Sequence, residues 1–169
     1  LRDEQIDCVI ICTRHDLHAR MAAEALRSGK SVFVEKPLAI DIRGLKDVID
    51  AYNQSGQVLM VGFNRRFSPF ALKAKELLEQ VREPLFINIR VNAGFIPREH
   101  WVHDPIEGGG RIIGEVCHFV DLALFFTGSY PTRVYAENIA VEHYCYDDNV
   151  AATLTFEDGS ICTISYLSN

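Results

Sequence analysis

The first half of the chain alternates short apolar runs with segments of helical periodicity, and this alternation limits the possible folds more than any other feature. The apolar runs have strand length and lie at residues 6–13, 31–34 and 58–63. The helical segments space apolar side chains three or four positions apart, at residues 17–27, 42–52 and 70–81. Strands that are buried on both faces and joined by helices are typical of parallel sheets. The sequence therefore predicts a parallel α/β portion up to about residue 82.

Two of the predicted helices begin with specific capping residues. Asp41 precedes the second helix, where its carboxylate can accept a hydrogen bond from a backbone N–H of the first turn. Ser68-Pro69 opens the third helix, where proline is tolerated because the first turn leaves its N–H groups without helical partners. We therefore expect helices to begin just after Asp41 and at Pro69.

The pattern changes after Pro84. Apolar and polar side chains now alternate, which predicts strands with one buried and one wetter face. These strands are expected at residues 85–95, 133–141, 149–156 and 160–167. The last two flank Asp158-Gly159, a tight-turn signal that favours a hairpin. This half of the chain is therefore expected to form part of an open antiparallel sheet domain.

A loop and a helix separate the first of these strands from the others. The loop covers residues 96–110, and the helix covers 111–127 and ends at Gly128. The expected fold class is therefore α/β followed by α+β. Two partial domains follow from it: residues 1–82 and residues 83–169.

Composition excludes several classes of protein. Seventeen Lys and Arg against 23 Asp and Glu give a net charge of −6, without runs of like charge. This balance argues against a general nucleic-acid or anionic-membrane binder. No apolar stretch reaches the ~18 residues of a membrane-spanning helix, and the first residues lack the apolar core of a secretory signal. The five scattered cysteines favour free thiols in a reducing compartment, so we expect a cytoplasmic protein.

The tripeptide Glu35-Lys36-Pro37 directly follows a predicted parallel strand. Ligands bind at the carboxyl ends of the strands in open α/β sheets, so a lysine here can be placed for chemistry. Pro37 fixes the backbone as it leaves the sheet, and Glu35 is a possible charge partner. The alternative interpretation is a solvated charge pair at the end of a strand.

A second candidate group follows three consecutive glycines at residues 108–110. His118 and Asp121 are three residues apart on the predicted helix and therefore share a face, with Gly114 one turn earlier. An imidazole beside a carboxylate suits a general base, because the carboxylate can fix the tautomer and stabilise the imidazolium. The alternative is a histidine on the helix surface beside a solvated aspartate.

A zinc site is the third possibility, because four side chains of ligand type occur within eleven residues: Cys8, Cys12, His15 and His18. We do not expect one. Both cysteines belong to a predicted buried strand, and the histidines follow the turn into the next helix, so four ligands would not converge tetrahedrally.

Two further segments have open interpretations. Asn64-Arg65-Arg66 follows the third predicted strand and can hold anionic cofactor groups or simply solvate a loop. Trp101 lies in the polar loop after the first alternating strand. It can form a wall of a ligand site or anchor the loop.

Taken together, these segments resemble the nicotinamide-dependent sugar and polyol dehydrogenases that include glucose-fructose oxidoreductase and inositol 2-dehydrogenase. The resemblance covers nearly the whole chain, and it lies in IDCVIICT, the histidine at 18, GKSVFVEKPLA, VGFNRRFSP and GGGRIIGEVCHFVDLALFFTG. Within the family, EHWVHDPIEGGGRIIGEVCHFVDL looks most like the branch fused behind a zinc-dependent alcohol-dehydrogenase-like module. The resemblance implies that the parallel portion is the C-terminal half of a Rossmann-type sheet.

The resemblance also implies roles for individual residues. Lys36 would hydrogen-bond the reacting hydroxyl, His118 would take its proton, and Asp121 would align the substrate or the imidazole while a hydride moves to NAD or NADP. The positions that match the surroundings of the nicotinamide and its ribose are Thr13, His18, Glu35, Lys36, Pro37, Asn64 and Arg65. Arg14 departs from the family, which commonly has proline after the threonine.

The sequence contains no GxGxxG phosphate loop. We therefore expect an interior segment of a dehydrogenase, whose parent is an enzyme but which is inactive alone and does not bind NAD or NADP with micromolar affinity. The expected substrate is a sugar-like or polyol molecule, and relatives suggest a homo-oligomer formed through the antiparallel sheet. The alternative is a non-catalytic nucleotide- or sugar-binding sensor or scaffold. The intact trio of Lys36, His118 and Asp121 favours the enzyme.

Overall fold

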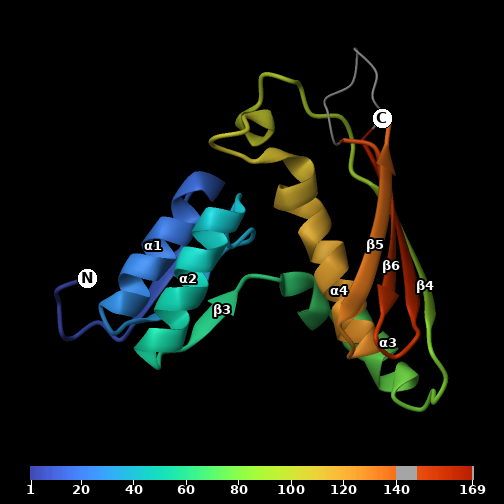
Figure 1. The fold of residues 1–169 in the computed structure, drawn as a ribbon, viewed down its shortest axis with the longest axis horizontal. Helices are drawn as coiled ribbons and strands as arrows, with labels where there is room; N and C mark the ends of the chain where they lie inside the picture. The colour runs from blue at the N-terminus through green and yellow to red at the C-terminus, as the bar shows by residue number, and fades with distance from the viewer. Residues whose placement is uncertain (140–147, 169) are drawn as a thin grey trace. The chain divides into compact units, whose positions relative to one another are not determined.

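The computed structural model describes residues 1–139 and 148–168, and these form two compact units (Figure 1). Unit 1 consists of Leu1–Phe63 and Trp101–Gly114. Unit 2 consists of Asn64–His100 and Glu115–Asn169. The expected domain boundary near residue 82 stays a prediction.

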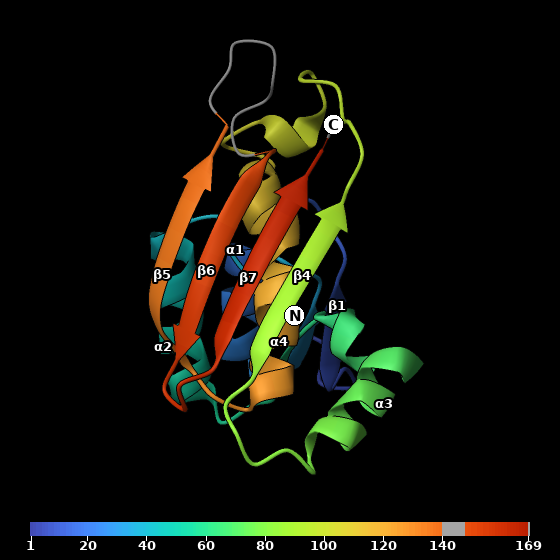
Figure 2. The same cartoon turned by 90° about the vertical axis from the view of Figure 1, so that its right-hand side faces the viewer.

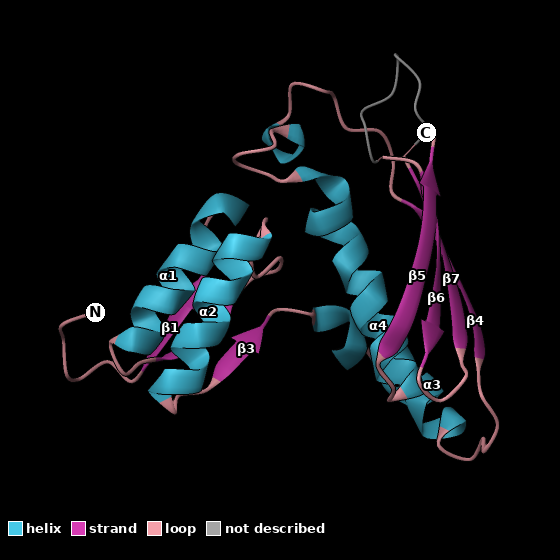
Figure 3. Cartoon of the chain, in the orientation of Figure 1, coloured by secondary structure: helices cyan, strands magenta, loops and turns pink. Residues whose placement is uncertain are grey.

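Unit 1 contains a three-stranded parallel sheet with two helices (Figure 3). Its strands lie side by side in chain order: β1 (Cys8–Ile11), β2 (Ser31–Val34) and β3 (Leu59–Val61). Helices α1 (His15–Arg27) and α2 (Ile42–Ser55) connect successive strands. The predicted parallel α/β portion is therefore confirmed: β2 matches its apolar run, whereas β1 and β3 are shorter than theirs.

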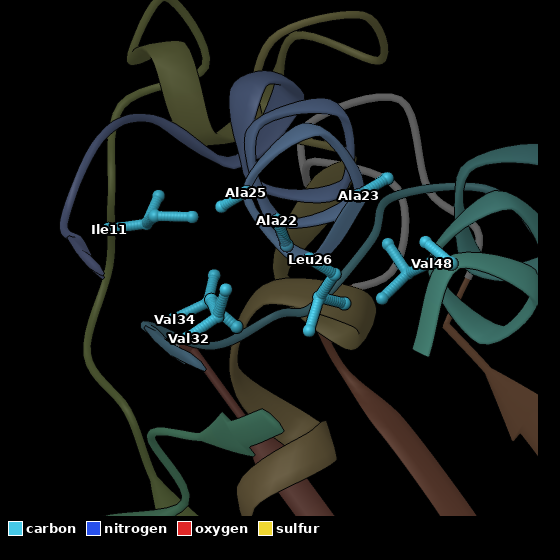
Figure 4. Close-up of a cluster of buried hydrophobic side chains, with 9 residues drawn as sticks. Ile11, Ala22, Ala23, Ala25, Leu26, Val32, Val34 and Val48 are labelled. Carbon is cyan, nitrogen blue, oxygen red and sulfur yellow. The ribbon is translucent and has the colours of Figure 1, made fainter. Parts of the chain in front are cut away.

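The core of unit 1 lies between the sheet and the two helices (Figure 4). Val32 and Val34 are 2% and 0% exposed, and they pack in one cluster with Leu26 of α1 and Val48 of α2. The opposite face of the sheet is open, since Ile10 is 70% exposed. The expectation of strands buried on both faces is therefore wrong for this unit, because both helices cover the same face.

The predicted burial of the two cysteines near β1 is wrong. Cys8 and Cys12 are exposed rather than buried. Within residues 1–139 and 148–168, no group of three or more His, Cys, Asp or Glu side chains is arranged to hold a metal ion.

The predicted helix starts are confirmed. The carboxylate of Asp41 accepts a hydrogen bond from the Gly44 N–H at 2.7 Å, and α2 begins at the next residue. The Ser68 hydroxyl accepts a hydrogen bond from the Ala71 N–H at 3.2 Å, and α3 (Pro69–Leu78) begins with proline.

Unit 2 contains a four-stranded sheet in the order β4-β7-β6-β5 (Figure 2). The strands are β4 (Phe86–Asn92), β5 (Pro131–Asn138), β6 (Val150–Phe156) and β7 (Ile161–Leu167). β6 and β7 form the predicted hairpin, and β5 pairs antiparallel with β6. β4, however, pairs parallel with β7. The sheet is therefore mixed, and the expectation of an antiparallel sheet is wrong at this pair, because alternation reveals the faces of a strand but not the direction of its neighbour.

One face of this sheet is covered by helix α4 (Cys117–Thr127), which lies behind the strands in Figure 2. Leu154, Ile164 and Tyr166 are buried on that side, whereas Phe86 and Tyr135 are 72% and 65% exposed. Part of the strand predicted at 133–141 lies outside the described residues. No helix among the described residues has both the length and the apolar content to cross a membrane.

The helix predicted at 111–127 is confirmed only in part. Its first portion, η3 (Ile112–Val116), is π-helical. The α-helix begins at Cys117 and ends at Thr127, and it is capped by Gly128, whose φ of 67° is left-handed. A π-helical turn holds more residues than an α-helical turn. Contrary to the prediction from the sequence, Gly114 therefore does not lie one α-helical turn before His118 on the same face.

Candidate active site

Lys36 lies at the carboxyl end of β2, as the sequence predicts. It is half-buried, its ammonium donates a hydrogen bond to the Gly114 carbonyl at 2.7 Å, and its peptide bond to Pro37 is cis. The hydrogen bond gives the lysine a fixed position at the strand ends. It also leaves two of the three ammonium hydrogens for other acceptors.

Glu35 faces the neighbouring strand end rather than the lysine ammonium. A Cβ at Gly62, directly after β3, would lie 3.0–3.1 Å from the Glu35 carboxylate. Glycine at this position therefore allows the carboxylate to lie against the backbone after β3. The backbone N–H of Lys36 donates to the same carboxylate at 3.3 Å.

His18 connects two of the strand-end loops. Its Nδ1 lies 2.8 Å from the Pro37 carbonyl, and its Nε2 lies 3.0 Å from the Thr13 carbonyl. The side chain is 1% exposed. His18 therefore links the loops after β1 and β2, because each ring nitrogen lies against a backbone carbonyl of a different loop.

The loop that carries Trp101 is anchored to the start of α1. Arg14 forms an ion pair with Glu107, and its guanidinium lies 5.1 Å from the centroid of the Trp101 ring. His15 packs edge-on against the same tryptophan, with ring centroids 4.8 Å apart. These contacts favour the interpretation of Trp101 as a loop anchor.

In unit 2, His118 and Asp121 are both buried on α4. The Asp121 carboxylate receives two hydrogen bonds from the Arg66 guanidinium, one from Nε at 2.9 Å and one from Nη2. Arg66 also lies over the Phe125 ring, 5.5 Å from its centroid. Asp121 is therefore held in place by a bidentate ion pair, which is a strong and directional arrangement.

The sequence did not assign this role to Arg66. Arg65 and Arg66 are adjacent in the 3₁₀ helix η1 (Asn64–Phe67), and nothing in the sequence distinguishes which one pairs with an acid. The Arg65 guanidinium instead lies 4.6 Å from the centroid of the Phe119 ring. Asn64 begins η1.

A further carboxylate on the same helical segment also has a specific partner. Glu115 accepts a hydrogen bond from the hydroxyl of Tyr166, whose side chain is 0% exposed on β7. Glu115 precedes His118 by three residues. Tyr166 was not identified from the sequence, because on an alternating strand a buried tyrosine looks like any other core residue.

The predicted site residues thus fall into two groups. Unit 1 contributes those at the strand ends: Thr13, His18, Glu35, Lys36 and Pro37. Unit 2 contributes those of η1 and α4: Asn64, Arg65, His118 and Asp121. The convergence of Lys36 and His118 on one substrate stays a prediction.

The parallel sheet and connecting helices of unit 1 place it in the class of Rossmann-type α/β folds. Residues 1–63 match the family model described as "Oxidoreductase family, NAD-binding Rossmann fold", and residues 71–168 match the "GFO/IDH/MocA C-terminal domain". The chain belongs to the GFO/IDH/MocA family. The resemblance inferred from the sequence is therefore confirmed at the level of the family, while the fused zinc-dependent branch stays a prediction.

Relatives agree with this family along nearly the whole chain. An uncharacterized oxidoreductase of Bacillus subtilis (strain 168), YrbE, is 32% identical over 97% of this chain and 49% of its own length. The scyllo-inositol 2-dehydrogenase (NAD(+)) of the same organism is 30% identical over 95% of this chain and 48% of its own length. The chain thus spans about half the length of the curated relatives that it matches.

The fold is also that of solved dehydrogenases. A levoglucosan dehydrogenase, solved in complex with NADH and levoglucosan, superposes with a TM-score of 0.85 at 26% identity. The match covers 99% of this chain and 49% of that one.

Proposed function

We propose that this chain is the catalytic segment of an oxidoreductase that transfers a hydride between a sugar or polyol hydroxyl and NAD or NADP. The observation that carries the proposal is the position of Lys36. Its ammonium is fixed at the carboxyl end of a parallel strand, in the part of the chain that matches an NAD-binding Rossmann model. Relatives named as a scyllo-inositol 2-dehydrogenase and a levoglucosan dehydrogenase support the substrate class.

We propose that the residues at the strand ends hold the nicotinamide end of such a cofactor. Backbone and side-chain groups after β1 and β2 lie together there, because His18 bridges Thr13 and Pro37. The residues that we assign to this end of the cofactor are Thr13, His18, Glu35, Lys36, Pro37, Asn64 and Arg65. The nicotinamide, when bound, supplies the hydride acceptor.

The proton and the hydrogen bonds come from the chain itself. As an alcohol carbon is oxidised to a carbonyl, His118 takes the hydroxyl proton, and Lys36 donates a hydrogen bond to the reacting oxygen. The carbon loses one hydride and the oxygen one proton, so the reaction balances with one oxidised nicotinamide per substrate. Asp121, held by Arg66, provides a fixed negative charge on the helix of His118.

The proposal extends to location and assembly. We place the protein in the cytoplasm as a homo-oligomer that associates through the outer face of the mixed sheet. The exposure of Phe86 and Tyr135 on that sheet supports an interface, because large exposed apolar side chains favour association. Nucleic acid and membrane are not expected partners, because the net charge is −6.

The test is a substrate screen on the intact protein that contains this segment. Inositols, aldoses and anhydrosugars are offered with NAD or NADP, and formation of the reduced nicotinamide is followed by absorbance. We expect turnover of at least one polyol or sugar. Specific binding of a nucleotide or sugar without any turnover would instead support a non-catalytic sensor.

A further inference from the structure

His15, the first residue of α1, is enclosed within unit 1 by groups of the loop that follows Trp101. Its side chain is 8% exposed, and its Nδ1 lies 2.8 Å from the Gly108 carbonyl. A carbonyl oxygen only accepts hydrogen bonds, so Nδ1 must carry the proton. The neutral ring is therefore the Nδ1–H tautomer.

The ring also lies against Gly114. A Cβ at Gly114 would be 3.0 Å from Cε1 of His15 and 3.5 Å from its Nδ1. The imidazole therefore occupies the space that a side chain at residue 114 would need. The carbonyl of the same glycine accepts the hydrogen bond from Lys36 at 2.7 Å. His15, Gly114 and Lys36 thus form a continuous series of contacts.

We propose that His15 is a positioning residue, which fixes Gly114 and through the Gly114 carbonyl holds the Lys36 ammonium in place. The proposal rests on the function proposed above for Lys36 and adds a residue to that site. With one hydrogen bonded to a fixed carbonyl, the remaining two ammonium hydrogens have restricted directions. Such restriction favours one orientation of the substrate hydroxyl.

The electrostatic surroundings agree with a neutral ring. Burial lowers the pKa of His15, and the charge of Lys36 and the neighbouring His18 lower it further. The Gly108 carbonyl and Asp16 act in the opposite direction but do not reverse the shift. A neutral imidazole adds no second positive charge beside the lysine.

A simpler alternative is that His15 only anchors the loop, as Arg14 does. Arg14 pairs with Glu107 and stacks on Trp101. None of these contacts involves Gly114. Arg14→Leu is therefore a matched control, which loosens the same loop without removing the support of the glycine.

The experiment measures hydrogen exchange of the Lys36 ammonium by ¹⁵N NMR of the 169-residue chain. The signal is assigned from its loss in Lys36→Met. In His15→Ala we expect exchange to become about tenfold faster, because the carbonyl that holds the ammonium is no longer fixed. His15→Asn restores slow exchange, since its carboxamide can donate to Gly108. Arg14→Leu stays within about twofold of the parent. Equal acceleration in His15→Ala and Arg14→Leu would overturn the proposal.

A second measurement needs no variant and so does not depend on whether His15→Ala folds. The ¹⁵N shifts of the imidazole report the tautomer directly, and we expect Nδ1–H for His15. The Nε2–H tautomer would contradict the Gly108 contact and the proposal with it. Neither measurement uses activity, so an inactive protein would count against the proposed function without touching this inference.

Discussion

Replacing Arg66 with leucine should destabilise unit 2 by leaving a buried carboxylate without its partner. The guanidinium donates two hydrogen bonds to Asp121. The side chain of Asp121 is only 9% exposed, whereas that of Arg66 is 32% exposed. After the substitution the aspartate would stay enclosed by α4 and its neighbours, because leucine offers no hydrogen-bond donor.

Removing one partner of a buried ion pair costs about 3–5 kcal/mol of unfolding free energy. The partial exposure of Arg66 lets water replace some of the lost hydrogen bonds, so we expect about 2–3 kcal/mol. For a chain of this size that corresponds to a fall of about 4–12 °C in Tm. The double variant Arg66→Leu/Asp121→Asn should recover much of the loss, because it removes the unpaired charge.

The assay is urea unfolding followed by circular dichroism. Arg27→Leu is the matched control, because it breaks an ion pair with Asp47 whose side chains are 47% and 49% exposed. Exposed ion pairs contribute little to the free energy of unfolding, so we expect Arg27→Leu to lower the urea midpoint far less than Arg66→Leu does. Equal shifts in the two single variants, or no recovery in the double variant, would show that the Arg66–Asp121 pair is not a stabilising buried pair.

Three further outcomes are expected. Burial raises the pKa of the Cys162 thiol to about 11. A thiol reagent at about pH 8 should therefore label the exposed Cys8 and Cys12 in the native chain but Cys162 only after denaturation, which mass spectrometry of the labelled peptides checks. Burial alone would raise the pKa of Asp158, but hydrogen bonds from Ser160 and Ser129 outweigh burial and lower this pKa, so the carboxylate stabilises the fold at neutral pH and the stabilisation is lost as acid protonates it. Asp158→Asn should therefore flatten the fall in unfolding free energy below about pH 4, and an unchanged fall would contradict this role of Asp158. Light scattering should show a dimer or larger species that Tyr135→Arg dissociates, whereas an unchanged mass would place the interface elsewhere.

The sequence predicts the helix starts and the hairpin turn of this fold well, because each depends only on residues that are close together in the chain. The caps at Asp41 and Ser68 depend only on neighbouring backbone groups, and the turn at Gly159 depends on a φ of 87°. The pairing of β4 with β7 joins residues far apart in the chain. Alternation of apolar and polar residues contains no information about such a partner or its direction.

In the candidate site, too, features set by neighbouring residues could be predicted, whereas contacts between distant residues could not. Lys36 could be placed at the end of a strand because the preceding apolar run is short and clear. The partner of Asp121 could not be identified, because Arg65 and Arg66 differ only in where the turn of η1 directs them. The sequence indicates His15 only as one of four possible zinc ligands, because its contacts with Gly108 and Gly114 depend on how the long loop folds back.

The proposed mechanism requires Lys36 and His118 to act on the same substrate hydroxyl. The most direct measurement is single-turnover formation of the reduced nicotinamide by the intact protein, compared among the parent, Lys36→Met and His118→Ala. We expect each variant to lower the rate by ~10²-fold or more with little change in cofactor affinity, and the double variant to fall by less than the product of the two losses. Rates within a few-fold of the parent for either single variant, with chemistry still limiting, would rule out this mechanism.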